Sequence, residues 1–146
     1  TEGVVGFAIG KRNKKSFLLV VKNSIQLSLF TAFIISILYL IFFKQIINII
    51  TDIDILRFIA YKHAIWIIII PPVASFCYQL DGIFIGASQT RDMRNGMMFS
   101  VACFIIISIY STKYFGNHGL WFSLLLFTVL RSLTLRYFLN NILKKF

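Results

Sequence analysis

The sequence predicts an all-α integral membrane protein with four full transmembrane helices and a partial helix at the N-terminus. Hydrophobic residues make up 58% of the 146 residues and charged residues only 14%, whereas soluble domains carry about a quarter charged residues. Long uncharged segments alternate with short basic ones, which is typical of a chain that crosses a membrane several times. With eight glycines, two prolines and two cysteines, collagen-like, disordered and disulfide-framework classes are excluded.

The chain opens with an apolar segment, residues 1–10, that is typical of the end of a helix. It is too short to span a bilayer, which needs about 20 apolar residues, and it lacks the basic region of a signal peptide. The first residue is Thr1 rather than Met. We therefore expect a fragment of a longer protein in which this helix begins upstream.

Four longer apolar segments follow, and each is predicted to cross the membrane. Residues 23–43 are 21 uncharged residues, and residues 95–112 are 18. Residues 64–90 form a span interrupted by two prolines and one acidic residue, and residues 119–139 form the last span. Between the first two spans, the charged segment suggests a short interfacial helix over 53–61 on the outer surface.

Basic residues are distributed unevenly between the two sides of the membrane. The strongest cluster, Lys11–Lys15, belongs in the cytoplasm by the positive-inside rule. Because the loops are short, neighbouring helices are antiparallel, so residues 44–63 and 113–118 lie outside while residues 91–94 and the tail lie inside. This topology has eleven basic residues inside and four outside. The sequence therefore predicts a multi-pass protein with a cytoplasmic C-terminus.

Asp81 is the residue most indicative of function, because it lies inside an apolar span. A carboxylate at the bilayer centre costs about 2.5–3.5 kcal/mol on insertion scales, so its side chain is expected to face protein or water. At helical spacing it shares a less apolar stripe with Tyr78 and Ser88, and Gln79 flanks this stripe. Two interpretations remain open. Either this set binds H⁺ or Na⁺ and lines a cavity, or Asp81 only hydrogen-bonds a neighbouring helix.

Prolines and glycines add two structural expectations. Pro71 and Pro72 remove backbone donors and predict a kink, which either lines a transport cavity or is purely structural. The patterns Gly82-xxx-Gly86 and Gly6-xxx-Gly10 predict close packing between helices.

No pattern in the sequence predicts enzymatic chemistry, a metal site or a cofactor. Metalloprotease motifs, phosphate-binding loops, nucleophile elbows and Cys/His clusters are all missing. The net charge of +10 is explained by basic loops at the cytoplasmic face, so no nucleic-acid partner is expected. Arg131 and Arg136 are expected to snorkel toward the cytoplasmic end of the last span.

Two segments carry a recognisable family pattern: QLDGIFIGASQTRDMRN at 79–95 and GNHGLW at 116–121. A looser Glu-x-x-Val-Gly-x-x-x-Gly pattern runs from Glu2 to Gly10. In these segments the chain resembles the multidrug and toxic compound extrusion (MATE) family, specifically its DinF-like branch, and the resemblance covers essentially the whole chain.

The resemblance implies a single membrane domain over residues 1–146 that runs from the end of helix 8 through helix 12 of a transporter with two six-helix lobes. It also implies that the first lobe lies outside these 146 residues. The expected function is part of a cation-coupled efflux antiporter of the bacterial inner membrane, not active alone, which exchanges small amphipathic drug-like compounds for H⁺ or Na⁺. Its expected partners are the lipid bilayer and the missing N-terminal lobe, on the same or a separate chain.

The role of Asp81 depends on the branch of the family. In NorM-like relatives an acid at its position helps to bind the coupling cation, whereas DinF-like members place the coupling acid in the first lobe. Two alternatives stay open. One is a lipid-linked polysaccharide flippase of the same superfamily, against which the acidic charge at membrane depth argues, and the other is an inactive truncated membrane protein.

Overall fold

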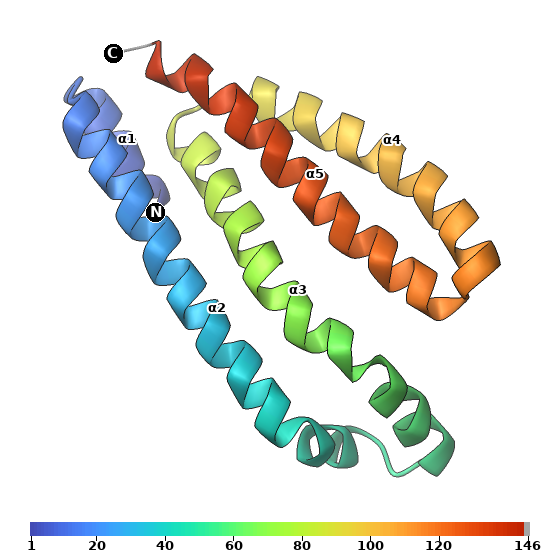
Figure 1. Ribbon diagram of the computed structural model, residues 1–146. Helices are drawn as coiled ribbons and strands as arrows, with labels where there is room; N and C mark the ends of the chain where they lie inside the picture. Colours follow the sequence, from blue (N-terminus) through green and yellow to red (C-terminus); the bar gives the residue numbers. More distant parts are fainter. Residues whose placement is uncertain (145–146) are drawn as a thin grey trace.

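The computed structural model describes residues 1–144, and over these residues it consists of five helices joined by short turns (Figure 1). The helices are α1 (Glu2–Gly10), α2 (Lys14–Ile50), α3 (Asp54–Gly86), α4 (Thr90–Phe115) and α5 (Asn117–Leu143). By length and composition, α2 to α5 can each cross a membrane, whereas α1 is too short. The predicted class, all-α with four full spans and a partial N-terminal helix, is confirmed.

Several helices are longer than the sequence predicts. α2 has 37 residues, and at about 1.5 Å per residue it exceeds the bilayer core of about 30 Å. The expectation of a separate interfacial helix over 53–61 is wrong, because α3 begins at Asp54 and continues into the membrane span. Residues 54–70 contain no glycine or proline that would end a helix. Residues 91–94, expected to form a loop, lie in the first turns of α4, since they too contain no glycine or proline.

The turn between α4 and α5 is a single residue, Gly116, rather than the expected loop over 113–118. Its φ of 56° lies in the left-handed region that glycine adopts without steric cost. A Cβ added at Gly119 would lie 2.1 Å from the carbonyl oxygen of Ser111, so the first turn of α5 contacts the last turns of α4 directly. The two helices thus form a tight hairpin.

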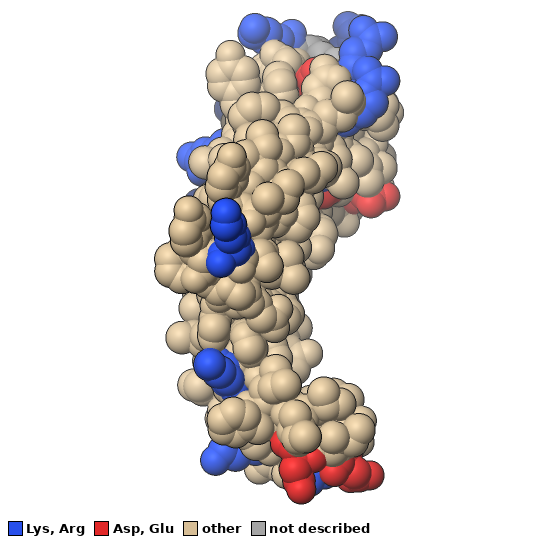
Figure 2. Space-filling model, turned by 90° about the vertical axis from the view of Figure 1, so that its right-hand side faces the viewer, with Lys and Arg blue, Asp and Glu red and all other residues tan. Residues whose placement is uncertain are grey.

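Successive helices run in opposite directions, as predicted (Figure 1). The α1–α2 turn, the α3–α4 turn and the C-terminal end of α5 lie at one end of the bundle, which we call the basic end. The other two turns lie at the opposite end (Figure 1). Figure 2 shows basic side chains gathered at the basic end and a patch of acidic side chains at the opposite end.

The buried core lies where α1, α2, α3 and α5 meet near the basic end. Its largest fully buried side chains are Phe17, Leu80, Ile83, Phe84, Leu135 and Ile142. α3 is the central element of the fold, since it packs against all four other helices. Many large apolar side chains elsewhere are exposed, including Phe30, Phe33 and Ile41 of α2. An apolar surface of this kind is suited to contact with lipid or with further helices.

The glycine pattern in α3 packs against α1, as predicted. A Cβ added at Gly86 would lie 2.5 Å from the carbonyl oxygen of Glu2, and one at Gly6 would lie 3.3 Å from the carbonyl oxygen of Gly86. Backbone atoms of α1 and α3 therefore approach each other as small residues permit. A Cβ added at Gly10 would have no neighbour within 4 Å, so within the α1 pattern Gly6 makes this contact and Gly10 does not.

Pro71 and Pro72 lie inside α3, which remains helical through both of them. Figure 1 shows that α3 bends between its dark-green first part and its paler remainder. A bend is the expected result of losing two backbone donors and of the clash between the proline rings and the preceding turn.

Candidate functional site

Asp81 forms a buried ion pair with Arg131, and this pair is the centre of the candidate site. Arg131 Nη2 donates to Asp81 Oδ1 at 2.8 Å, and Arg131 Nε donates to Oδ2 at 3.2 Å. Only 17% of the Asp81 side chain and 7% of the Arg131 side chain are exposed. The packing of α3 against α5 brings the two residues together. The result is a two-pronged, charge-assisted contact, the stronger kind of protein hydrogen bond.

The pair has contacts on three helices. Arg131 Nη1 points to the thioether sulfur of Met97 on α4. Cys77, one turn before Asp81, is 1% exposed, and its thiol interacts with both members of the pair. Ser132, next to Arg131, is buried, and its hydroxyl donates to the carbonyl oxygen of Thr128 at 2.8 Å. The site is therefore a small polar cluster at the junction of α3, α4 and α5.

The expectation that Arg131 snorkels toward the cytoplasm is wrong. Arg131 as a whole is only 6% exposed, because the carboxylate of Asp81 lies within reach and neutralises the charge of the guanidinium. Two opposite charges in apolar spans lower each other's burial cost, although they do not remove it. Arg136, five residues further along α5, is exposed. Opposite charges in two different apolar spans are the signal that could have predicted the pair.

The other predicted site residues do not gather around Asp81. Tyr78 is 69% exposed and lies on a different side of α3 from the pair. Gln79 accepts a hydrogen bond from the hydroxyl of Thr1 at 2.8 Å. Ser88 lies beyond the end of α3, in the turn before α4, with φ 55°. The helix ends at Gly86, so helical spacing no longer applies to Ser88.

Tyr78, Gln79 and Pro71 do line one groove together, between α2 and α3. The groove has a volume of about 340 Å³ and is also lined by hydroxyl residues of both helices. The hydroxyls of Ser28 and Ser75 hydrogen-bond to each other across the helix pair. The structure thus separates the predicted stripe into a buried ion pair on one side of α3 and an open polar groove on another.

Two histidines and a tryptophan connect α3 to the start of α5, far from the basic end. Trp66 Nε1 donates to Nδ1 of His118 at 3.0 Å, and the rings of His63 and His118 stack with centroids 4.3 Å apart. Nδ1 of His63 lies 2.8 Å from the carbonyl oxygen of Ile59. Neighbouring Phe115 and Phe122 help to line an apolar pocket of about 310 Å³ at this contact. The arrangement fastens α3 to the α4–α5 hairpin.

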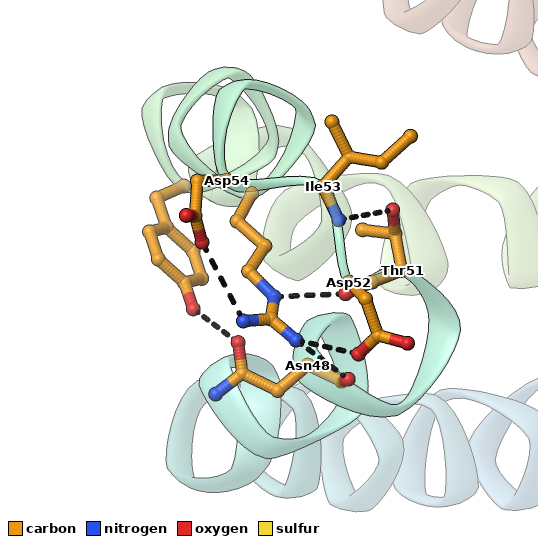
Figure 3. Close-up of polar contacts among 7 residues, drawn as sticks. Asn48, Thr51, Asp52, Ile53 and Asp54 are labelled. Atoms are coloured by element: carbon orange, nitrogen blue, oxygen red, sulfur yellow. Dashed lines mark hydrogen bonds and ion pairs between the residues drawn. The ribbon is translucent and has the colours of Figure 1, made fainter.

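Arg57 organises the turn between α2 and α3, and Figure 3 labels its partners Asn48, Thr51, Asp52 and Asp54. Its Nε donates to the carbonyl oxygen of Thr51 at 2.8 Å, and its Nη2 donates to the carbonyl oxygen of Asn48 at 3.2 Å and to Asp52 Oδ1 at 3.0 Å. The last carbonyls of a helix lack partners within the helix. Arg57 donates hydrogen bonds to two of these carbonyls, and Asp52 and Asp54 balance its charge. These contacts connect the end of α2 to the first turn of α3.

Over residues 1–144, no group of three or more histidine, cysteine, aspartate or glutamate side chains is placed to hold a metal ion. The four long apolar helices define the class of the protein, a multi-pass α-helical membrane protein, and Asp81 and Arg131 form a charged pair inside its spans. The model of the MatE family matches residues 1–112. The chain belongs to the MatE family.

A sequence match to a curated protein also supports membership of the family. The chain is 35% identical over 130 residues to the DNA damage-inducible protein F of Escherichia coli (strain K12), a match that covers 89% of this chain and 28% of the relative. The chain thus spans well under half of that protein's length. No solved structure matches the chain.

Proposed function

We propose that this chain forms part of the second lobe of a MATE-type efflux antiporter in the bacterial inner membrane. The transporter exchanges small amphipathic compounds for H⁺ or Na⁺, and Asp81 is a cation site. The observation that carries the proposal is the carboxylate of Asp81, largely shielded inside an apolar span at the junction of α3, α4 and α5. Ionisable residues at membrane depth commonly mark ion and substrate pathways. Membership of the MatE family supports a role in transport rather than in enzymatic catalysis.

The open groove between α2 and α3 supplies the second part of the proposal. Tyr78 offers an exposed aromatic ring, and Gln79 and Thr31 offer polar groups beside it. An apolar wall with a few polar groups suits small amphipathic ligands. We propose that this groove faces the substrate pathway, and that the bend in α3 near Pro71 allows the helix to flex there.

Transport by alternating access requires two lobes that move against each other around a central site. We therefore propose that these helices act with a first lobe, on the same or a separate chain, and that they do not transport alone. The basic end of the bundle is proposed to face the cytoplasm, which the cluster Lys11–Lys15 supports (Figure 2).

Asp81→Asn in the native polypeptide tests the coupling role. Cells that produce this variant are expected to lose resistance to a cationic dye and to stop its efflux, with the protein still inserted in the membrane. Asp54→Asn is the matched control, because the side chain of Asp54 is 95% exposed at the α2–α3 turn. Normal efflux by a well-inserted Asp81→Asn variant would show that Asp81 is only structural.

A second variant separates loss of coupling from loss of folding. Asp81→Asn alone leaves Arg131 as a buried charge without its partner, which is strongly destabilising. Asp81→Asn combined with Arg131→Gln removes both charges, so it is expected to insert well and still fail to transport. Full efflux by this double variant would refute the proposed cation site.

The flippase alternative is less well supported. Such a role needs cationic side chains free to bind pyrophosphate, and Arg131 is the only buried basic residue within residues 1–144. Its charge is already neutralised by Asp81. Loss of dye resistance on Asp81→Asn would favour efflux over this alternative.

A further inference from the structure

The ion pair already uses both oxygens of the Asp81 carboxylate. Arg131 Nη2 contacts Oδ1 and Arg131 Nε contacts Oδ2. The two side chains are largely shielded from solvent, so little water screens their charges from each other or from a third ion. A soluble cation at this carboxylate would either replace the guanidinium or lie next to a like charge. The carboxylate therefore has room for one of the two cations at a time.

Arg131 has no second anionic partner within residues 1–144. Its remaining nitrogen, Nη1, points to the sulfur of Met97, and a thioether is a weak acceptor. The acid nearest along α4, Asp92, accepts instead from the side chain of Asn141 at 3.0 Å. Arg131 and a soluble cation thus depend on the same single carboxylate.

We propose that Arg131 is an internal cation that competes with Na⁺ for Asp81. In the conformation described here, Arg131 holds the carboxylate and the lobe is closed to the ion. Na⁺ binds when a movement of α5 relative to α3 carries the guanidinium away, and the return of Arg131 expels the ion. Arg131 is thus a specificity-determining residue of the site, and the proposal rests on the role of Asp81 as a cation site.

Heat unfolding of the purified native polypeptide in detergent, with Na⁺ replaced stepwise by choline at constant ionic strength, tests the competition. In Arg131→Gln, half of the Na⁺-dependent rise in Tm is expected at a Na⁺ concentration at least tenfold lower than in the wild type. Arg136→Gln is the matched control, because Arg136 lies on the same helix and is exposed. The control is expected to respond to Na⁺ as the wild type does.

The double variant Asp81→Asn with Arg131→Gln shows whether the gain arises at Asp81, and it is expected to lose the response to Na⁺. An unchanged response in Arg131→Gln, or a gain that survives in the double variant, overturns the proposal. Either outcome would mean that Arg131 only positions Asp81.

A measurement on the unaltered pair covers the case in which Arg131→Gln does not fold. The thiol of Cys77 is 1% exposed and interacts with both Arg131 and Asp81. With Cys103 and any cysteine outside residues 1–146 replaced by alanine, Na⁺ is expected to speed the alkylation of Cys77 several-fold over choline, because departure of Arg131 uncovers the thiol. Equal alkylation rates of Cys77 in Na⁺ and in choline would overturn the proposal.

These binding measurements are independent of transport. If Asp81→Asn leaves dye efflux intact while Arg131→Gln gains affinity for Na⁺, the proposed function fails and the competition stands. If Asp81→Asn abolishes efflux while Arg131→Gln and the wild type bind Na⁺ with the same affinity, the proposed function stands and the competition fails.

Discussion

The contact between α1 and the end of α3 depends on a missing side chain at Gly86. A Cβ there would lie 2.5 Å from the carbonyl oxygen of Glu2 and 3.0 Å from both Cα of Glu2 and Cβ of Val5. Ordinary contacts of a Cβ begin at 3.4 Å, so Gly86→Ala requires α1 to move by about 0.9 Å. The atoms that obstruct it include backbone, which cannot rotate away as a flexible side chain can.

Overpacking of this kind typically costs about 1–3 kcal/mol. Replacing glycine by alanine in a helix returns about 1 kcal/mol, so the net change for Gly86→Ala lies between about zero and a loss of about 2 kcal/mol. Val5 and Ala8, which are 0% and 2% exposed, would lose part of their packing as α1 shifts. We expect a lower Tm in heat unfolding of the detergent-solubilised native polypeptide.

Two other glycines provide matched controls. At Gly82 the nearest atom to an added Cβ is the flexible Cγ of Glu2 at 3.7 Å, and at Gly10 no atom lies within 4 Å. Gly82→Ala and Gly10→Ala are therefore expected to leave Tm unchanged or to raise it slightly. The reasoning is refuted if Gly86→Ala unfolds at the same temperature as these two controls.

Four further predictions concern the ion pair, the α2–α3 turn, the contact between Trp66 and His118, and the polypeptide itself. Asp81→Asn and Arg131→Gln are each expected to destabilise the protein by about 3–5 kcal/mol, and the double variant by much less than their sum; additive losses of Tm would show that the pair is not coupled. Arg57→Lys is expected to lower Tm, because an ammonium group cannot contact two carbonyls and a carboxylate as a planar fork does; Lys62→Arg, at an exposed position of α3, is the control, and equal Tm values would contradict the role of Arg57. Trp66→Phe removes the indole donor to His118 and is expected to cost about 0.5–1.5 kcal/mol; no change in Tm would mean that the hydrogen bond contributes nothing. Finally, an antibody against residues 144–146 is expected to detect a native band of about three times 16.9 kDa, as two six-helix lobes require; a band near 16.9 kDa would require the first lobe to be a separate chain.

The existence and number of the spans could be predicted from the sequence, because uncharged runs of about 20 residues have few alternatives to a membrane helix. Their ends could not. Lys44 and Arg91 mark the edges of apolar runs, yet both lie inside helices, since charge changes the depth of a helix without ending it. The backbone continues until a residue such as Gly116 adopts a conformation that helices exclude.

The candidate site was predictable in part. Burial of Asp81 follows from the cost of a carboxylate in an apolar span. Its pairing with Arg131 depends on how far α3 and α5 slide past each other, and a separation of 50 positions along the chain leaves that offset undetermined. Tyr78 shares an approximate face with Asp81 by helical spacing, but α2 and α5 pack on different sides of α3, and this divides the face.

The one-residue turn at Gly116 also bears on how the protein is made. Because α4 and α5 pack against each other and are already in contact at Ser111 and Gly119, next to the turn, they can enter the membrane as a preformed hairpin, which spares α5 from crossing alone with Arg131 in its middle. α3 precedes them along the chain, so Asp81 is already in the bilayer when that arginine arrives. The order of synthesis thus brings Arg131 into a membrane that already holds its partner.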